Sequence, residues 1–471
     1  MAFKLFNTLS RSLEEFVPLD PAGKKVGLYC CGPTVYDLAH IGNFRTFVFA
    51  DLVRRHLEFK GYNVRHVMNV TDVEDKIIAR VRESGLSLTQ YTGKYEEAFF
   101  ADLQALNCRR PHEIPHATQF IPEMVALIGK LVERGVAYKA NDGSVYFSIE
   151  KYQAAGGRYG QLVKLDFENM RAGERVRSDD YAKESVADFA LWKARAPGDG
   201  AVFWPSPWGD GRPGWHIECS AMSMKLLGTS FDLHLGGEDL AFPHHEDEIA
   251  QSEGAGVQES GQRFVKYWVH GAHLLVEGKK MSKSLGNFYT LPDLMAKGFT
   301  GREIRHLMLT AHYRESFNFT LEGLQGSRAA LGRIDECMAK LRALAGNTPA
   351  SDTPPWLARF SDALDDDLNM SAAWGVVFEW VREQNRAMAE NSLTPVQAAD
   401  ALAAWSQADT VLGIGAAAET EAPAEMLQLL EARQAARKAK DFKRADALRD
   451  EIKAKGWLIE DTTKGPKLKK V

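Results

Sequence analysis

The stretch FPHHEDEIAQ, residues 242–251, contains two histidines and three acidic residues directly after a proline. If a helix begins here, His244 and Glu248 share one face at spacing i, i+4, and His245 and Glu248 meet at i, i+3. Imidazole and carboxylate groups both bind zinc. Acidic residues in a first helical turn also interact favourably with the helix dipole, and Pro243 suits that turn. The stretch is therefore either half of a metal site or a charged helix start, and it does not choose between the two histidines.

Three cysteines could supply the remaining ligands of a metal site. Cys30 and Cys31 close a predicted strand, where successive side chains point to opposite faces, so only one of them can face a site beyond the strand end. Cys219 lies in the segment GWHIECSAM. Zinc takes about four ligands. One strand-end cysteine, Cys219, one histidine of the pair and Glu248 would make up that number, although the chain has no CxxC motif.

Two further segments have residue types that bind phosphate. HIGN, residues 40–43, opens a predicted helix directly after a strand, where a helix N-terminus attracts anions and Gly42 allows close approach of a nucleotide to the backbone. KKMSKSLGN, residues 279–287, offers lysine charges that suit a triphosphate and the charge of a phosphoryl transition state. A solvated lysine loop would have the same composition, so neither segment decides the chemistry alone.

The elements that must position these residues follow a β–α–β order. KKVGLYCCG predicts a short strand, HIGNFRTFVFADLVRRHLEFKGYN a helix stopped by Gly61, and NVRHVMNVTD a second strand. After residues 112–205, which break this rhythm, we expect the sheet to resume around WHIECSAMSMKLLG, FDLHLGGEDL and FVKYWVHGAHLLV. Ligands bind where the carboxyl ends of parallel strands converge. We predict an α/β Rossmann-type nucleotide-binding catalytic domain with an inserted subdomain, followed by helical C-terminal domains.

The composition is that of a globular protein without a membrane span. Of 471 residues, 45% are hydrophobic and 26% are charged, and we find neither an export signal nor an apolar run long enough to cross a membrane. Five cysteines without framework spacing favour a reducing compartment, so we expect a cytoplasmic protein. Residues 431–471 carry a local charge of +6 in a chain whose net charge is −5. A basic tail on an acidic body favours a polyanionic partner, although a solvated helix face would have the same charge.

The order of these motifs resembles that of a known family. HIGN with KMSKS far downstream resembles the paired signature of class I aminoacyl-tRNA synthetases. More narrowly, YCCGPTVYDLAHIGN, NVTDVEDKII, WPSPWGDGRPGWHIECSAM and FPHHEDEIAQ resemble segments of the cysteinyl-tRNA synthetase family, and the likeness covers nearly the whole chain. Such enzymes activate L-cysteine with ATP as cysteinyl-adenylate and transfer it to the 3′ end of tRNA(Cys).

The resemblance implies roles for most of the residues above. In that family two cysteines, a histidine and a glutamate hold a zinc ion, which selects cysteine over serine through its thiolate. The ligands implied here are Cys31, Cys219, His244 and Glu248, which leaves Cys30 and His245 outside the site. The implied catalytic residues are His40, Asn43, Lys280 and Lys283. ATP would be bound by His40, Gly42 and Lys283, and the substrate cysteine by Gly32, Thr71 and Trp215.

The resemblance also implies a domain order. It comprises the first half of the catalytic domain (1–111), an inserted connective subdomain (112–205), the second half with zinc ligands (206–278), the KMSKS loop with a helical stem-contact region (279–345), a helical bundle on the anticodon side (352–414) and a basic tRNA-binding tail (425–471). We expect one Zn²⁺ per chain and Mg²⁺ with ATP as cofactors. The expected partners are tRNA(Cys), ATP and L-cysteine, and the chain is expected to act as a monomer without an editing domain.

Two positions depart from the family pattern. Asn43 stands where the class usually has a second histidine, so His40 is the stronger catalytic candidate. Leu468 stands where related chains often have a tryptophan, which bears on anticodon contacts. A ligase that joins activated cysteine to an amino sugar would share the catalytic core but lack the basic tail. A non-catalytic nucleic-acid-binding relative would be expected to lose a zinc ligand or the lysine loop, and both are present in this sequence.

Overall fold

The computed structural model describes residues 1–163, 188–279, 281, 286–415, 423–439, 441–455, 457–462 and 465–470. The chain divides into two compact units, Met1–Ile414 and Gly415–Val471. Among the described residues, no helix combines the length and the apolar character needed to cross a membrane.

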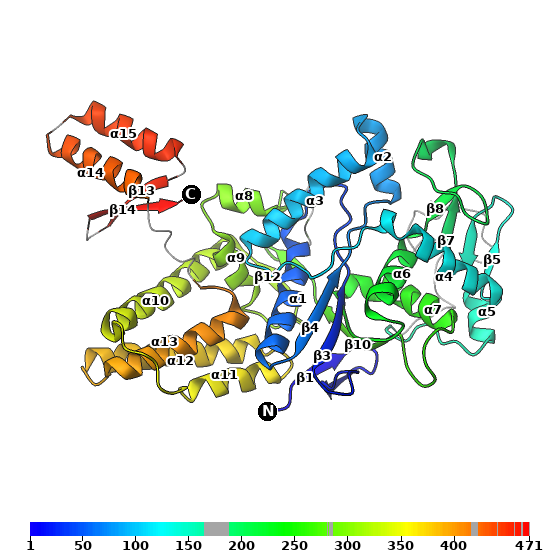
Figure 1. Ribbon diagram of the computed structural model, residues 1–471, viewed down its shortest axis with the longest axis horizontal. Helices are drawn as coiled ribbons and strands as arrows, with labels where there is room; N and C mark the ends of the chain where they lie inside the picture. The colour runs from blue at the N-terminus through cyan, green and yellow to red at the C-terminus, as the bar shows by residue number, and fades with distance from the viewer. Residues whose placement is uncertain are drawn as a thin grey trace. The chain divides into compact units, whose positions relative to one another are not determined.

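A four-stranded parallel sheet organises the first unit (Figure 1). In sheet order its strands are Val265–Gly271 (β10), Phe231–Gly237 (β9), Lys25–Cys30 (β3) and Asn63–Met68 (β4). Strand β9 is buried along its whole length, as expected for a parallel sheet that is covered on both faces. The helix Ile41–Phe59 (α1) connects β3 to β4, and Gly61 follows it at φ 89°. The predicted β–α–β unit and the α/β fold class are confirmed.

One segment that was expected in the sheet is a helix. WHIECSAMSMKLLG folds as Trp215–Leu227 (α6). Residues 217–223 are all buried, and a helix that is buried on every side lacks the amphipathic period that would separate it from a buried strand. Cys219 therefore lies on a helix, and the prediction that its segment belongs to the sheet was wrong.

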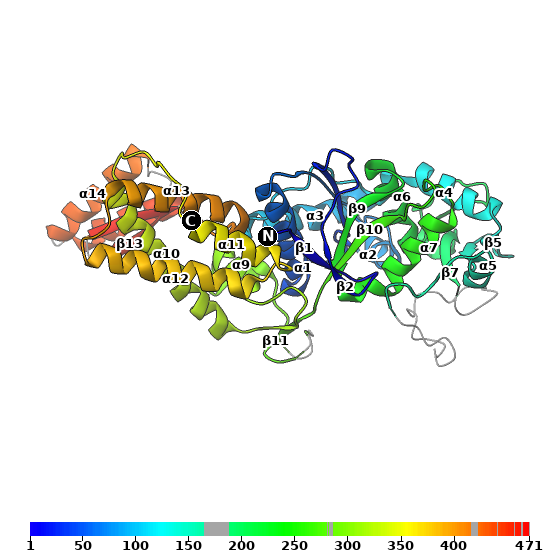
Figure 2. The same ribbon diagram turned by 90° about the horizontal axis from the view of Figure 1, so that it is seen from below.

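The stretch that interrupts the parallel sheet contributes a second, antiparallel sheet. Its strands pair in the order Ala137–Lys139 (β5), Val145–Phe147 (β6), Phe189–Ala194 (β7) and Gly211–Pro213 (β8). The helices Ile121–Glu133 (α4) and Ile149–Ala154 (α5) belong to the same region. Figure 2 shows this region on the opposite side of the parallel sheet from the last helices of the first unit.

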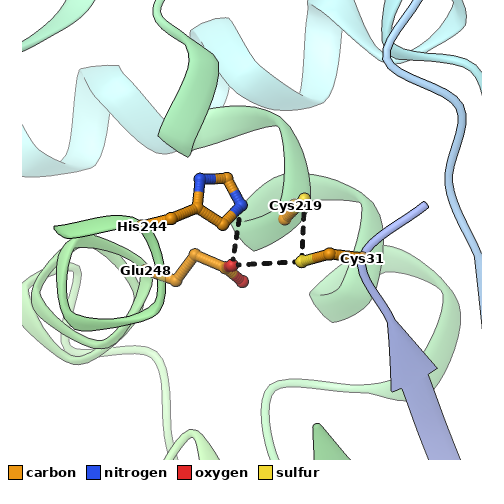
Figure 3. A group of neighbouring side chains, drawn as sticks. All are labelled: Cys31, Cys219, His244 and Glu248. Carbon is orange, nitrogen blue, oxygen red and sulfur yellow. Dashed lines mark hydrogen bonds and ion pairs between the residues drawn. The ribbon is translucent and has the colours of Figure 1, made fainter. Parts of the chain in front are cut away.

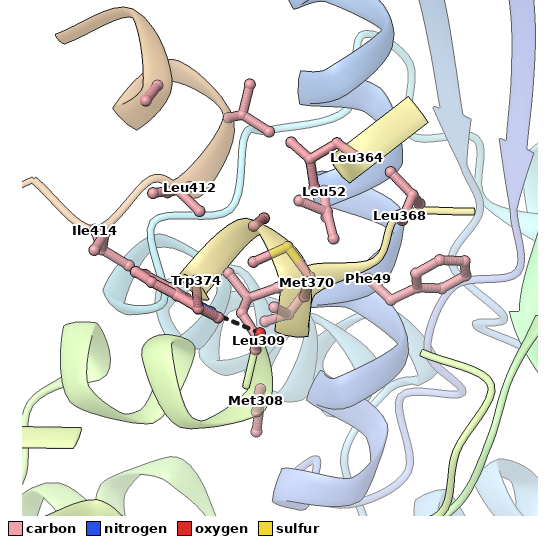
Figure 4. Close-up of a cluster of buried hydrophobic side chains, with 14 of the residues drawn as sticks. Phe49, Leu52, Met308, Leu309, Leu364, Leu368, Met370, Trp374, Leu412 and Ile414 are labelled. Atoms are coloured by element: carbon pink, nitrogen blue, oxygen red, sulfur yellow. Dashed lines mark hydrogen bonds between the residues drawn. The ribbon is translucent and has the colours of Figure 1, made fainter. Parts of the chain in front are cut away.

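Helices dominate the rest of the first unit, and they share one core with α1. Figure 4 shows Leu52 of α1 in a cluster with Leu364, Trp374 and Leu412. The Trp374 indole donates a hydrogen bond to the carbonyl oxygen of Leu309 at 2.9 Å. The remaining elements are Lys4–Asn7 (β1), Ser12–Glu15 (β2), Asp75–Ser84 (α2), Leu88–Ala105 (α3), Glu246–Gly254 (α7), Leu274–Val276 (β11), Leu291–Ala296 (α8), Gly301–Met308 (α9), Phe317–Phe319 (β12), Leu321–Ala345 (α10), Trp356–Asp365 (α11), Met370–Ala389 (α12) and Pro395–Leu412 (α13).

The second unit has a small core of its own. It consists of Ala424–Lys438 (α14), Phe442–Ala454 (α15) and the hairpin of Trp457–Thr462 (β13) with Gly465–Lys470 (β14). Residues 425–456, EMLQLLEARQAARKAKDFKRADALRDEIKAKG, have the pattern of one long basic amphipathic helix, but they form two helices. Asp441 caps α15 by accepting a hydrogen bond from the Arg444 amide at 3.1 Å. An aspartate at this position is a signal for the start of a helix, but the helical pattern of apolar residues continues across it and hides the signal. Leu468 packs against the core formed by Met426, Ile452 and Trp457.

Candidate active site and metal centre

The HIGN segment forms the beginning of α1. His40 is the N-cap, and its Nδ1 accepts a hydrogen bond from the Asn43 amide at 3.3 Å, while Asn43 Oδ1 accepts from the His40 amide at 3.1 Å. Asn43 thus completes a reciprocal cap that holds His40 in place. Both residues line a cavity of ≈ 860 Å³. Burial lowers the pKa of His40, so its ring is neutral at pH 7.

Met281, within the predicted lysine segment, and Phe288, directly after it, lie against the start of α1. A Cβ added to Gly42 would lie 2.7 Å from Met281 Cε, which places this methionine directly beside the helix start. The Phe288 ring packs edge-on against His40, with 5.3 Å between ring centroids. Outside the described residues lie the two predicted catalytic lysines, Lys280 and Lys283.

The four predicted zinc ligands lie together in a buried cluster (Figure 3). Cys31 Sγ lies 3.8 Å from Cys219 Sγ and 3.7 Å from Glu248 Oε1. His244 Nε2 lies 3.2 Å from the same Glu248 oxygen. All four ligand atoms lie within 4.8 Å of one another, and these separations suit one ion with bonds of about 2.0–2.3 Å. The cluster combines the end of β3 with α6 and the start of α7.

A second set of four groups overlaps with the first. Cys31 and Glu248 also lie within 4.8 Å of His234 and His245. His245 Nε2 is 3.4 Å from Cys31 Sγ, and His234 Nε2 is 2.9 Å from Glu248 Oε2. The first set contains two thiols and the second only one. Thiolates are soft ligands that favour zinc, so the first set suits zinc better. With a metal in the first set, His234 and His245 become hydrogen-bond donors that orient two of its ligands.

Burial sets the protonation of these groups. It raises the pKa of the Cys31 thiol well above its usual value and that of the Glu248 carboxyl to about 8. It lowers the pKa of His244 to about 3, so this imidazole is neutral and free to act as a ligand. Holding two thiolates and a carboxylate ionised in such a place requires a compensating positive charge. A dication bound by this donor set supplies that charge, and the set fits zinc.

His244 also has a partner on its other nitrogen. His244 Nδ1 lies 2.8 Å from His216 Nδ1, and His216 Nε2 lies 3.5 Å from Asp247 Oδ2. Helix α7 begins at Glu246, later than the sequence suggested, because the preceding turn is irregular with Phe242 at φ −143° and ψ 134°. His244 nevertheless reaches Glu248.

The residues predicted to bind the substrate cysteine adjoin the metal cluster. The Gly32 amide donates to Asn69 Oδ1 at 2.9 Å, and a Cβ at Gly32 would lie 1.7 Å from the Asn69 carbonyl oxygen, so only glycine fits there. Asn69 Nδ2 donates to Thr71 Oγ1 at 3.3 Å. Trp215 lines the same cavity as Gly32, and its ring centroid lies 4.4 Å from that of His244. Gly32 and Trp215 thus line the cavity, whereas Thr71 is joined to Gly32 through Asn69 and is not one of the lining residues.

Comparison with known proteins places this site in a family. Residues 16–329 match the class I (C) tRNA synthetase catalytic domain, residues 359–416 the DALR domain, and residues 419–466 the cysteinyl-tRNA ligase anticodon binding domain. The cysteine–tRNA ligase of Chlamydia muridarum is 47% identical over 99% of both chains. That of Protochlamydia amoebophila is 45% identical over 99% of this chain and 98% of its own. The chain belongs to the cysteine–tRNA ligase family. It is an enzyme that joins cysteine to tRNA.

Solved structures support the fold of this cysteine–tRNA ligase. Mycobacterium tuberculosis methionyl-tRNA synthetase in complex with methionyl-adenylate aligns with a TM-score of 0.55 at 14% identity, over 83% of this chain and 90% of that one. The LeuRS of Agrobacterium radiobacter K84, in a ternary complex with tRNA, aligns with a TM-score of 0.60 at 11% identity, over 85% of each chain. The class I catalytic fold predicted from the sequence is confirmed.

Sequence reasoning missed several residues of the ligase's site. His234 is a histidine between two leucines of the strand FDLHLGG, a signal that could have found it. Asn69 directly follows β4 and so lies at the same sheet edge as Cys31. His216 and Asp247 lie within GWHIECSAM and FPHHEDEIAQ, but nothing in their spacing along the chain showed that their side chains would be in contact.

Proposed function

We propose that Cys31, Cys219, His244 and Glu248 hold a zinc ion with which this cysteine–tRNA ligase distinguishes cysteine from serine. A hydrophobic pocket discriminates poorly between side chains that differ only by sulfur for oxygen. When bound, zinc supplies a coordination position that favours a thiolate over a hydroxyl. The observation that carries the proposal is the buried group of two thiols, an imidazole and a carboxylate within 4.8 Å of one another, at a cavity that His40 also lines.

The phosphate chemistry is assigned to the other end of that cavity. The cysteine carboxylate attacks the α-phosphate of ATP and pyrophosphate leaves. The terminal ribose hydroxyl of tRNA then attacks the carbonyl carbon of the adenylate, takes the acyl group and releases AMP. Both steps need positioning and charge stabilisation rather than a covalent enzyme intermediate. Neutral His40 and the lysines Lys280 and Lys283 contact the phosphates, with Mg²⁺ accompanying ATP. Gly42 admits the nucleotide, and Asn43 contributes by holding His40.

The amino-acid end of the cavity is assigned to Gly32, Thr71 and Trp215. The Asn69 side chain supports this wall, because it accepts from the Gly32 amide and donates to the Thr71 hydroxyl. Trp215 covers His244, which restricts the access of water to the cluster. The basic residues 425–471 are assigned to tRNA(Cys), a role supported by the anticodon-binding match. Action as a monomer in the cytoplasm stays a prediction.

The function is tested by mixing the zinc-loaded protein with ATP, Mg²⁺, radiolabelled cysteine and bulk tRNA. We expect label that is sensitive to RNase and released by mild base, as a tRNA ester is. Cysteine-dependent pyrophosphate exchange without RNA labelling would contradict the transfer step, since the adenylate would then be passed to another acceptor. Activation of serine as strong as that of cysteine would overturn the role of zinc in selection.

His234→Ala is expected to lower the affinity for zinc about 10–100-fold, because loss of a donor to a ligating carboxylate typically has this effect. Its Nε2 lies 2.9 Å from Glu248 Oε2. Competition with a chelator measures the affinity. His234→Gln keeps an N–H donor and should recover most of it. Complete loss of zinc from both variants would instead identify His234 as a ligand.

A further inference from the structure

The C-terminal end of α13 is held by side chains from distant parts of the first unit. The last carbonyl groups of a helix have no partner within the helix. Here the carbonyl oxygens of Thr410 and Leu412 in the last turn, of the C-cap Gly413 and of the following Ile414 accept hydrogen bonds from Arg55, Arg305, Asn107 and Arg302, respectively. The first three bonds measure 2.9, 2.7 and 2.8 Å. We call the four donors the α13 clamp.

Two of the four donors, Arg55 and Arg305, are buried and braced by a carboxylate. Arg305 has no exposed side-chain surface and Arg55 is 6% exposed. Asp51 lies between them, 2.7 Å from Arg55 Nε and 2.6 Å from Arg305 Nη2. Burial alone would raise the pKa of Asp51, but the two guanidinium groups together lower it, so the carboxylate is charged. Removing one member of such a buried network leaves the charges of its partners uncompensated. The network is therefore costly to break, and it holds these side chains in place.

The backbone at the clamp fits these side chains closely. Gly413 has φ 62°, and a Cβ there would lie 3.1 Å from the Arg305 guanidinium. Asn107 has φ 53°, a conformation that asparagine tolerates better than most residues do. The Arg55 guanidinium also donates to the Asn107 carbonyl oxygen at 2.6 Å, which ties two donors to each other.

The clamp joins the helix that His40 caps to the residues with which the first unit ends. Asp51 and Arg55 lie on α1, the helix that His40 caps. The last clamped carbonyl is that of Ile414, where the first unit ends, and the anticodon-binding match begins at residue 419. A second binding module on the same chain raises the affinity for a ligand only if its attachment allows both modules to bind that ligand at the same time. A fixed attachment point also reduces the conformational entropy lost on binding.

We propose that the α13 clamp fixes the point from which the C-terminal unit departs and thereby strengthens binding of full-length tRNA. Arg55, Asn107, Arg302 and Arg305 act as positioning residues, since each donates to the end of α13 and none of them lines the cavity. The inference rests on the function proposed above, in which residues 425–471 bind tRNA(Cys).

The test is the double variant Asn107→Gly/Arg302→Met, which removes two donors, and with them the ion pair of Arg302 with Asp335, but keeps the positive φ at residue 107 and leaves the buried arginines in place. Its substrates are full-length tRNA(Cys) and a minihelix of only the acceptor and T stems. We expect KM for full-length tRNA to rise about 10-fold, the scale set by one or two net hydrogen bonds. Minihelix charging and cysteine-dependent pyrophosphate exchange should stay within about twofold, because neither uses the C-terminal unit.

A matched control is Arg359→Met, which removes an ion pair with Glu379 between α11 and α12 and should leave all three readouts unchanged. Gly413→Ala is a second route to the same result, because it strains the clamped end while retaining every donor. An unchanged KM for full-length tRNA in both clamp variants, or an equal loss with the minihelix, would overturn the proposal. Failure of the parent enzyme to charge any tRNA would refute the underlying function instead.

Discussion

Cys219→Ser is expected to abolish tight zinc binding and to reduce cysteine activation by more than about 100-fold. This is a larger effect than that of losing a residue that only hydrogen-bonds to a metal ligand. A serine hydroxyl is a poor zinc ligand at neutral pH, and the substitution leaves only Cys31 as a soft donor in the first set. Zinc content per chain and cysteine-dependent pyrophosphate exchange measure the two effects.

The matched control is Cys30→Ala. Cys30 is fully buried beside Cys31, but its thiol contacts the Cys31 carbonyl oxygen at 3.6 Å and lies outside both candidate ligand sets. We expect this variant to retain a full complement of zinc. Normal zinc content and activity in Cys219→Ser would contradict the assignment of Cys219 as a ligand.

Lys283→Ala is expected to reduce the rate of cysteine activation about 10²–10³-fold, the usual effect of removing one group that stabilises transition-state charge. Zinc content and the midpoint of thermal unfolding should stay at the parent values, because the role proposed for Lys283 is on the phosphates and it is not one of the proposed zinc ligands. The kcat of cysteine-dependent pyrophosphate exchange is the quantity to measure.

Lys279→Ala provides the control for general loss of positive charge. Lys279 belongs to the same stretch, and its described contacts are those of the backbone, which pairs with Val276 at 2.8 and 3.1 Å. We expect less than about a twofold change in this variant, in line with the weak effect of single exposed charges. An equal loss in both variants would show that the loop acts through its overall charge, and Lys283 would lose its assigned role.

Local patterns predicted the elements around the nucleotide end of the site well. β3, α1 and β4 follow from apolar runs, a glycine stop and the strand–helix–strand order. Helix α6 was mistaken for part of the sheet because burial on every side removes the period on which the distinction depends. The break between α14 and α15 was missed because one capping aspartate interrupts an otherwise continuous pattern.

The metal cluster shows where such reasoning stops. The alternation of side chains along a strand indicated that only one of Cys30 and Cys31 could face the site. Helical spacing did not distinguish His244 from His245 as the metal ligand. The family resemblance, rather than any local rule, selected Cys31 and His244. Contacts such as that of His234 with Glu248 join residues whose approach depends on how β9 and α7 pack, and no short-range pattern encodes that.

The single core that α1 shares with the helical bundle has a consequence for how the molecule unfolds and evolves. Side chains from the parallel sheet through α13 belong to one buried cluster, so the catalytic sheet and the bundle should melt as one cooperative unit. The last unit, with Met426, Ile452 and Trp457 as its separate core, should melt on its own. Natural selection can therefore exchange that terminal module as an independent part, whereas the bundle can change only together with the catalytic helix that it packs against.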